Sequence, residues 1–258
     1  MKKYKGLIAK IVFVAVCVIA WQLFAESKNL IAFPPLTKIF STLFSCIVNP
    51  KRAILKYLGN SLILIVKGLG IGAAAALVCS ALSVVFETFR SIYELIVSIF
   101  DLLPGVALLP ILIITVGAND AAILLLVIHS VVWPMSRSII DGFRTIPKLY
   151  IEAGRNFGLK GAGLITGVFI PASFANILSG IKVGWARAWR GLISAEMIFG
   201  AAQSAGIGVF INNARTVWID YASVYAALFL IIFVGVAVEY GVFKTIEKFT
   251  VKRWGMAR

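Results

Sequence analysis

The chain has 258 residues, of which 60% are hydrophobic and 14% are charged, and its mean hydropathy is +0.97. Soluble domains are about half apolar and about a quarter charged, so this composition excludes an ordinary soluble domain and indicates a polytopic membrane protein. The net charge of +14 would suggest nucleic acid in a soluble chain. In a membrane chain, Lys and Arg instead collect in cytoplasmic loops, so we expect no nucleic-acid partner.

Few residues could support catalysis or metal binding. Cys17, Cys46 and Cys79 lie far apart with no CxxC spacing, which indicates neither a metal site nor a disulfide framework. His129 has no companion ligand, so interior packing is its expected role. The sequence holds no GxxxxGK[ST], HExxH or GxSxG motif, and Asp101 and His129 are isolated. We therefore predict neither an ATPase nor an intramembrane enzyme.

The first 58 residues are predicted to form a transmembrane helix and an extracytoplasmic connection. Residues 11–25 are an apolar run that follows four lysines, a pattern shared by signal peptides and first spans. We favour an uncleaved span with the N-terminus inside, because the run is long and no small-residue cleavage site follows it. Residues 26–57 are amphipathic and carry five basic residues, which are unusual outside the membrane. A helix lying on the membrane surface would explain them.

The second predicted span covers residues 60–86. In this span Gly68, Gly72, Ala76 and Ser80 recur every four residues. Small residues at this spacing form a smooth stripe that lets a second helix approach closely. We therefore expect this span to pack inside a helix bundle.

A short turn at residues 87–94 and a kinked third span at 95–116 are predicted next. Pro104 and Pro110 lie in this span. Each proline frees a backbone carbonyl, which is tolerated only beside protein or a water-filled path. The fourth span is predicted at residues 121–140.

The fifth span is predicted at residues 174–199 and the sixth at 222–243. Fifteen of the 25 Lys and Arg residues then fall in segments assigned to the cytoplasm, which satisfies the positive-inside rule. The sequence thus predicts an all-α membrane protein with about six transmembrane helices and cytoplasmic N- and C-termini. The predicted parts are residues 1–58, a core membrane domain at 59–245 with a cytoplasmic loop at 141–171, and a basic cytoplasmic tail at 246–258.

The fifth span carries an unusual number of ionisable side chains. Each ionisable group at mid-membrane costs roughly 2.5–3.5 kcal/mol on insertion scales, so this helix cannot face lipid all round. Lys182, Trp189 and Glu196 share one face, and Arg187 and Arg190 share another. We expect either that the arginines help an anionic solute through a pathway, or that they pair with Glu196 or backbone carbonyls and hold helices together. The candidate pathway residues are Lys182, Trp185, Arg187, Trp189, Arg190 and Glu196.

A short amphipathic helix is predicted between the fourth and fifth spans. Pro147 suits the first turn of a helix, and Leu149, Ala153 and Phe157 then recur every four residues, giving one apolar stripe over about three turns. Gly158 would end the helix. A short helix of this kind between two spans is suited to docking a soluble partner.

This segment, EAGRNFGLKGAGLITGVFIP, resembles the cytoplasmic EAA loop of ABC importer permeases. In that loop, Glu-Ala-Ala is followed after three residues by Gly and after nine more by Ile-x-Leu-Pro, and the same spacing holds here from Glu152 to Pro171. Gly154, Val168 and Ile170 depart from the pattern by small or apolar replacements. The resemblance implies a coupling helix that sits in a groove of an ATPase subunit. The candidate coupling residues are Leu149, Glu152, Ala153, Gly154, Phe157, Gly158 and Pro171.

The flanking sequence resembles the nitrate/sulfonate/taurine branch of these permeases. That branch typically has a Pro-Pro segment outside the membrane and a fifth span with Gly-x-x-x-Gly, Trp and Ala-Glu followed by Gly-x-Gly. The residues that carry the resemblance are Pro34, Pro35, Gly180, Gly184, Trp189, Ala195, Glu196, Gly206 and Gly208.

The resemblance implies a type I ABC importer permease in a bacterial inner membrane. The expected partners are a second copy of the chain, two copies of a cytoplasmic ABC ATPase that hold ATP and Mg, an extracytoplasmic solute-binding protein and the lipid bilayer. No cofactor bound by this chain is expected. The implied solute is a small anion such as nitrate, a sulfonate or taurine. A thiamine-precursor pyrimidine, or a channel or scaffold that works without an ATPase, remains as an alternative.

Overall fold

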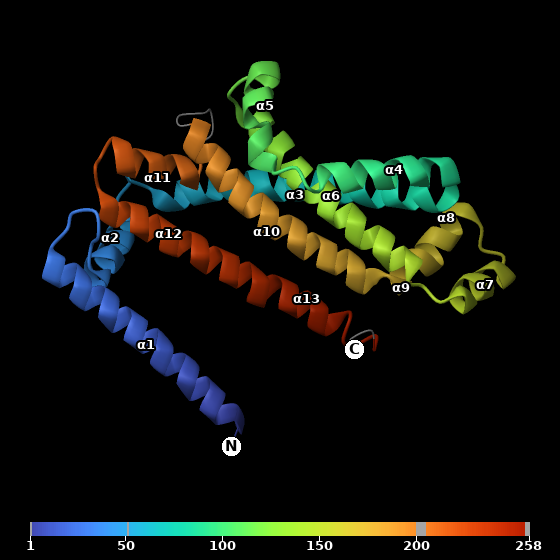
Figure 1. Cartoon of the computed structure of the whole chain (residues 1–258), viewed down its shortest axis with the longest axis horizontal. Coiled ribbons are helices and arrows are strands. Elements are labelled where there is room, and N and C mark those ends of the chain that lie inside the picture. Colours follow the sequence, from blue (N-terminus) through green and yellow to red (C-terminus); the bar gives the residue numbers. More distant parts are fainter. Residues whose placement is uncertain (1, 51, 200–204, 256–258) are drawn as a thin grey trace.

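The computed structural model describes residues 2–50, 52–199 and 205–255, so the last three residues of the predicted tail lie outside the described residues. The described residues form helices joined by short connections and include no strand. Figure 1 shows most long helices packed in one body, while α1 extends away from it. The helices are α1 (Lys2–Lys28), α2 (Leu36–Val48), α3 (Ile54–Val85), α4 (Glu87–Phe100), η1 (Gly105–Leu108), α5 (Leu109–Val116), α6 (Asp120–Arg144), α7 (Lys148–Asn156), α8 (Gly161–Leu164), η2 (Ile165–Phe169), α9 (Ile170–Ala172), α10 (Phe174–Phe199), α11 (Ile207–Thr216), α12 (Tyr221–Val236), η3 (Ala237–Phe243) and α13 (Lys244–Phe249).

Several helices are long and apolar enough to cross a membrane. Among the described residues, four single helices meet this condition, and two bent helix pairs raise the number to six if each pair counts as one span. The prediction of an all-α polytopic membrane protein is therefore confirmed, and α10 has the bounds predicted for the fifth span. The single helices are Ile8–Lys28, Ile54–Val85, Asp120–Arg144 and Tyr221–Phe249; the bent pairs are Glu87–Phe100 with Gly105–Val116 and Gly161–Ala172 with Phe174–Phe199.

The region of the third predicted span differs from the expectation of a turn at 87–94 and one kinked helix at 95–116. Instead, α4 already begins at Glu87, and the chain bends by 91° between α4 and the following η1–α5 segment. The first turns are helical because Tyr93 and Val97 are buried against α6, where the Tyr93 hydroxyl lies 2.6 Å from the Ser136 hydroxyl.

The prolines of this region do not kink a helix. Pro104 lies in the break before η1, and Pro110 occupies the first turn of α5, where a missing N–H costs no hydrogen bond. The predicted mid-span kink with freed carbonyl groups is therefore wrong, because the chain turns at a non-helical break. The proline that does lie inside a helix is Pro134 of α6, which the sequence-based prediction missed.

The core is organised around α6, which packs between α3 and α10. The small-residue stripe of α3 faces α6 as predicted, since a Cβ atom at Gly72 would lie 2.9 Å from Cβ of Val131. On the other side, a Cβ atom at Gly180 of α10 would lie 3.1 Å from Cα of Met135. These glycines bring three backbones close together. As a result, α6 is held tightly between α3 and α10, and the charged side chains of α4 and α10 lie beside it.

The connection before α3 packs against α12 and against the residue that precedes it. One face of α2 packs against α12, where Leu36 and Ile39 contact Ala226. One of the five basic residues of this region has a defined partner, because Arg52 forms an ion pair with Asp220 just before α12. The Arg52 guanidinium also lies 5.0 Å from the ring centre of Trp218. This packing ties α2 and the start of α3 to the α11–α12 connection, and the surface-helix interpretation stays a prediction.

The pairing with Arg52 predicts a pH-dependent stability. Burial by itself raises the pKa of the Asp220 carboxyl, but hydrogen bonds from Arg52 and Ser223 outweigh it and hold that pKa below its ordinary value. A carboxyl whose pKa is depressed by folding stabilises the protein above its unfolded pKa and loses this contribution as pH falls through the folded value. We expect the thermal unfolding temperature in detergent to fall below about pH 4, and Asp220→Asn to flatten this dependence. An unchanged slope in the variant, with Glu26→Gln as the control, would contradict the assignment.

Candidate functional site

The predicted docking helix is present as α7, and a backbone motif ends it. After α7, the N–H of Leu159 donates to the carbonyl of Gly154 at 3.0 Å, and the N–H of Gly158 donates to that of Arg155 at 2.9 Å. This pair of bonds is a Schellman motif, which needs a left-handed residue after the helix. Gly158 supplies it with a φ of +82°. The helix therefore ends at Asn156, and Phe157 lies just beyond it.

The side chains of α7 divide into an exposed set and a packed set. Leu149 is 69% exposed and Phe157 is 89% exposed, and Glu152 is exposed as well. Gly154 is buried, since a Cβ atom there would lie 2.7 Å from Cγ2 of Val168 in η2. Two of the three departures from the EAA pattern, Gly154 and Val168, are therefore in contact. Of the other candidate coupling residues, Ala153 is half-buried and Pro171 is exposed in α9.

A second candidate site is a cavity of about 300 Å³ at the break between α4 and η1. Its wall comes from the break itself, from the middle of α6 and from α10. Arg187 and Arg190 of the predicted pathway both line it. The other lining residues include Phe100, Asp101, Pro104, His129, Ser130, Trp133, Pro134, Gly191 and Ser194.

One carboxylate joins three helices beside this cavity. Oδ1 of Asp101 accepts a hydrogen bond from Nη1 of Arg187 at 2.6 Å, and Oδ2 accepts one from Nε of Arg137 at 2.8 Å. The Asp101 side chain is only 9% exposed. Arg190 forms no ion pair with any described residue. Three guanidinium groups thus lie near one carboxylate whose two oxygens are already occupied, so the site has an excess of positive charge and of hydrogen-bond donors.

His129 and Trp133 complete the polar wall. The ring centroids of His129 and Trp133 are 5.9 Å apart in an edge-on contact, and Trp133 stacks on Phe100. His129 therefore packs in the interior as expected. Its two ring nitrogens and Nε1 of Trp133 are nevertheless buried without a hydrogen-bond partner among the described residues. Buried polar atoms of this kind call for a partner, and a ligand in the cavity could supply one.

The remaining candidate pathway residues of α10 are paired or packed elsewhere. Lys182 pairs with Glu247 at 2.9 Å, and Trp185 stacks on Trp189 at 5.8 Å. Glu196 is buried and accepts hydrogen bonds from the Ser61 hydroxyl and from a backbone N–H of α11. Neither arginine pairs with Glu196 among the described residues; Nη1 of Arg187 instead donates to the backbone carbonyl of Asp101 at 3.3 Å, as the other half of that alternative expected. None of Lys182, Trp185, Trp189 and Glu196 lines the cavity. Their role in a pathway stays a prediction.

Sequence reasoning found Arg187 and Arg190 but missed the residues that complete the cavity. Asp101 was interpreted as isolated, and the structure corrects this, because its two arginine partners lie far away along the chain. The available signal was the presence of an acidic residue in an apolar segment, which requires a partner or a polar surrounding. That signal does not identify the partner. Only the packing of α4 and α10 on α6 does.

The sequence comparisons agree with this architecture. The chain belongs to the family of binding-protein-dependent transport system inner membrane components, whose sequence profile matches residues 68–248. It is therefore a multi-pass permease subunit of an ABC importer for small solutes. A putative ABC transporter permease protein of Methanocaldococcus jannaschii is 26% identical over 256 residues, which cover 96% of this chain and 93% of that protein.

Two relatives carry substrate names. The nitrate import permease protein NrtB of a Synechocystis species is 26% identical over 212 residues, covering 79% of this chain and 75% of NrtB. The taurine transport system permease protein TauC of Escherichia coli is 27% identical over 127 residues, covering 49% of this chain and 45% of TauC. The resemblance to the nitrate/sulfonate/taurine branch is confirmed at this level of identity.

The ion pairs of Asp101 predict a stability effect. In Asp101→Asn, the guanidinium groups of Arg137 and Arg187 lose their shared counter-charge within the membrane-spanning part. Removing one partner of a fully buried pair costs about 3–5 kcal/mol, and the partial exposure of both arginines reduces our expectation to about 1–3 kcal/mol. We would measure unfolding in detergent, with Glu239→Gln as a control carboxylate outside any ion pair. Equal stability of the two variants would show that the Asp101 bridge does not hold the helices together.

Proposed function

We propose that this permease passes a small anionic solute along the cavity at the α4–η1 break. The observation that carries this proposal is the charge balance there: Arg137, Arg187 and Arg190 surround one carboxylate, Asp101, whose oxygens are both engaged. The unmatched donors of Arg190 and His129 suit an oxygen-rich anion better than an uncharged pyrimidine. The substrate names of the nitrate and taurine relatives support the same choice.

We also propose that α7 couples this pathway to ATP hydrolysis. In this proposal α7 docks by its exposed Leu149, Glu152 and Phe157 onto a cytoplasmic ABC ATPase, which is present in two copies and holds ATP and Mg. A second copy of this chain completes the membrane part, and an extracytoplasmic solute-binding protein delivers the solute.

A continuous set of contacts supports this coupling. α7 contacts α8 and η2, and the chain then runs through α9 directly into α10, which carries Arg187 and Arg190. Closure of the ATPases would displace α7, and the packed segment of α8, η2 and α9 would transmit this movement to α10. Figure 1 shows α7 at the same end of the body as the start of α10.

The anion pathway predicts a transport defect without a folding defect. Arg190→Gln removes one guanidinium from the cavity wall. The loss of one charge-assisted hydrogen bond to the solute lowers the affinity for the solute by about 10–100-fold. We expect uptake in proteoliposomes to fall by about this factor while protein level and unfolding temperature stay normal, because Arg190 has no ion pair to lose. Arg215→Gln, an exposed arginine of α11, serves as the control. Intact uptake in Arg190→Gln would exclude Arg190 from the pathway.

The coupling role predicts a separate phenotype. Phe157→Ala removes an 89% exposed ring that makes no core contact, so the fold should be kept while the docking surface is lost. We expect ATPase activity stimulated by the solute-binding protein to fall at least about tenfold, because buried aromatic anchors dominate interface energies. Phe249→Ala, an exposed ring on α13, is the matched control. Normal stimulation in Phe157→Ala would remove this residue from the docking surface.

A further inference from the structure

A second charged cavity lies next to α7, at the C-terminal end of α6, whereas the first lies beside the middle of that helix. It has a volume of about 250 Å³ and is bounded by the end of α3 and by α4, α6, α7 and η2. Arg90, Arg144 and Arg155 line it together with Glu94, while Ile151 and Phe169 form its apolar floor. Nothing in the proposed coupling or in the first cavity accounts for this cluster.

The basic side chains of this cavity are not neutralised by protein. Nη2 of Arg144 donates to Oε2 of Glu94 at 2.6 Å. Arg90 has only an ion pair with Glu87, an 87% exposed side chain within the same helix, and such surface pairs contribute little. Arg155 forms no ion pair with any described residue. Three guanidinium groups and one carboxylate therefore leave an excess of positive charge that a bound anion would balance.

Glu94 adds a second, independent feature. Its Oε1 atom is buried and accepts no hydrogen bond from the described residues, although Oε2 accepts one from Arg144. A buried carboxylate oxygen without a donor is costly, so it calls for a donor from a ligand. The cavity thus offers guanidinium donors for an oxyanion and one free carboxylate oxygen for an N–H donor. An oxyanion that also carries an ammonium group matches both.

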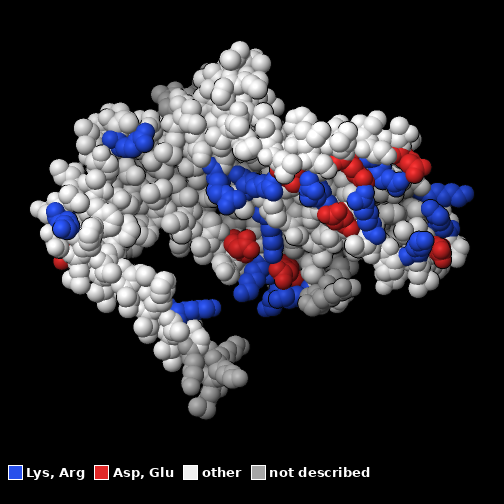
Figure 2. Space-filling model, viewed as in Figure 1, with Lys and Arg blue, Asp and Glu red and all other residues white. Residues whose placement is uncertain are grey.

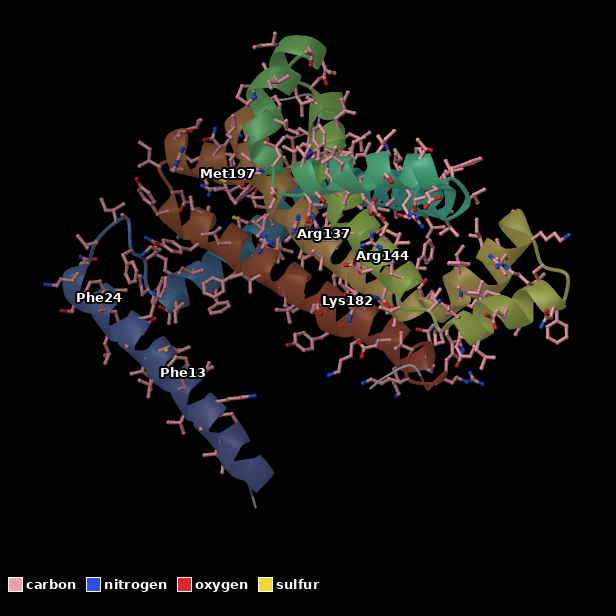
Figure 3. The ribbon with its side chains drawn as sticks, turned by 45° about the vertical axis from the view of Figure 1, so that its right-hand side comes forward. Phe13, Phe24, Arg137, Arg144, Lys182 and Met197 are labelled. Carbon is pink, nitrogen blue, oxygen red and sulfur yellow. The ribbon has the colours of Figure 1, made fainter. Side chains whose placement is uncertain are left out.

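The cavity lies at one end of a row of charged side chains. Arg137 and Arg144 are two helical turns apart on α6, and Figure 3 shows them following one another along that helix. A small cavity of about 100 Å³ between the two larger ones is lined by Glu94, Arg137, Asp141 and Arg144. Figure 2 shows Lys, Arg, Asp and Glu following a line across this face toward the α7 end. A row of charges on spanning helices cannot face lipid, so this face borders water or protein.

We infer that this cavity is a binding site for a zwitterionic oxyanion, a sulfonate or phosphate ester with an ammonium group, that ties α7 to the transmembrane body. Arg155 comes from α7 and Arg90 from α4, so a ligand held by both restricts the movement of α7. The inference rests on the proposed function only in taking α7 as the coupling element. The ligand is either a free aminosulfonate on the α7 side or the aminoethyl phosphate headgroup of a lipid.

The test measures amide hydrogen exchange of α7 in the purified, full-length permease. In nanodiscs of phosphatidylcholine, whose headgroup has no N–H donor, added 2-aminoethanesulfonate should slow exchange of the α7 amides. Arg155→Gln should raise the half-saturating concentration of the sulfonate about tenfold, which is the order expected for the loss of one charge-assisted hydrogen bond. Lys148→Gln on the same helix and Arg215→Gln, an exposed arginine of α11, should leave it unchanged. Methanesulfonate, which lacks the ammonium group, should protect less, and Glu94→Gln should abolish this difference.

A second arm separates the two sources of the ligand. The α7 amides are next measured in nanodiscs that contain phosphatidylethanolamine, without any added sulfonate. If they are protected from exchange there, and if Arg155→Gln removes this protection, the occupant is the lipid headgroup. If neither the free sulfonate nor this lipid protects α7, or if Arg155→Gln leaves protection intact, the inference is overturned. The measurement involves neither uptake nor ATP hydrolysis. The proposed function can therefore fail while this binding site is confirmed, and this site can fail while the proposed function is confirmed.

Discussion

The bridge from Asp101 to Arg137 and Arg187 is the interaction on which the rest of the charged structure depends. It lies where α4 stops, and it joins that break to α6 and α10 through bonds of 2.8 and 2.6 Å. Charges within a membrane-spanning bundle are tolerated only when they are paired or face water. By engaging both oxygens of one carboxylate, the bridge fixes Arg187 at the cavity wall and Arg137 beside it, while Arg190 lines the same cavity without an ion pair among the described residues.

The same packing gives the permease a mechanical connection between its two ends. α7 rests on η2 through Gly154, where there is no room for a larger side chain beside Val168. From η2 the chain runs into α10, which is held against α6 by glycine contacts and by the Asp101 bridge. In the proposed coupling, a displacement of α7 would reach α10 through packed backbones, which transmit movement because they cannot be compressed. The exposed ring of Phe157 stays available for a partner.

The candidate site shows how far sequence reasoning reaches. The short helix α7 was predictable because its signals are local: a proline just before it, a stripe at a spacing of four, and a glycine at its end. The arginines of α10 were predictable because charges in an apolar run stand out. Their partners were not, since Asp101 lies 86 residues before Arg187 and no local pattern joins them. The break after α4 was also missed, because a proline signals a change of direction without deciding between a kinked helix and a non-helical turn.

By itself, the sequence determined the class of protein, the number and order of the apolar segments, the position of the docking helix and the family to which the chain belongs. These depend on composition and on local periodicity, which are properties of neighbouring residues. Tertiary structure alone decided which faces of α10 meet protein and which meet a cavity, that Glu196 is bound by Ser61 and α11, and that Arg90, Glu94 and Arg155 converge beside α7. Such contacts depend on how helices pack against one another, because the energy of a charge inside a bundle is set by the side chains that surround it in space.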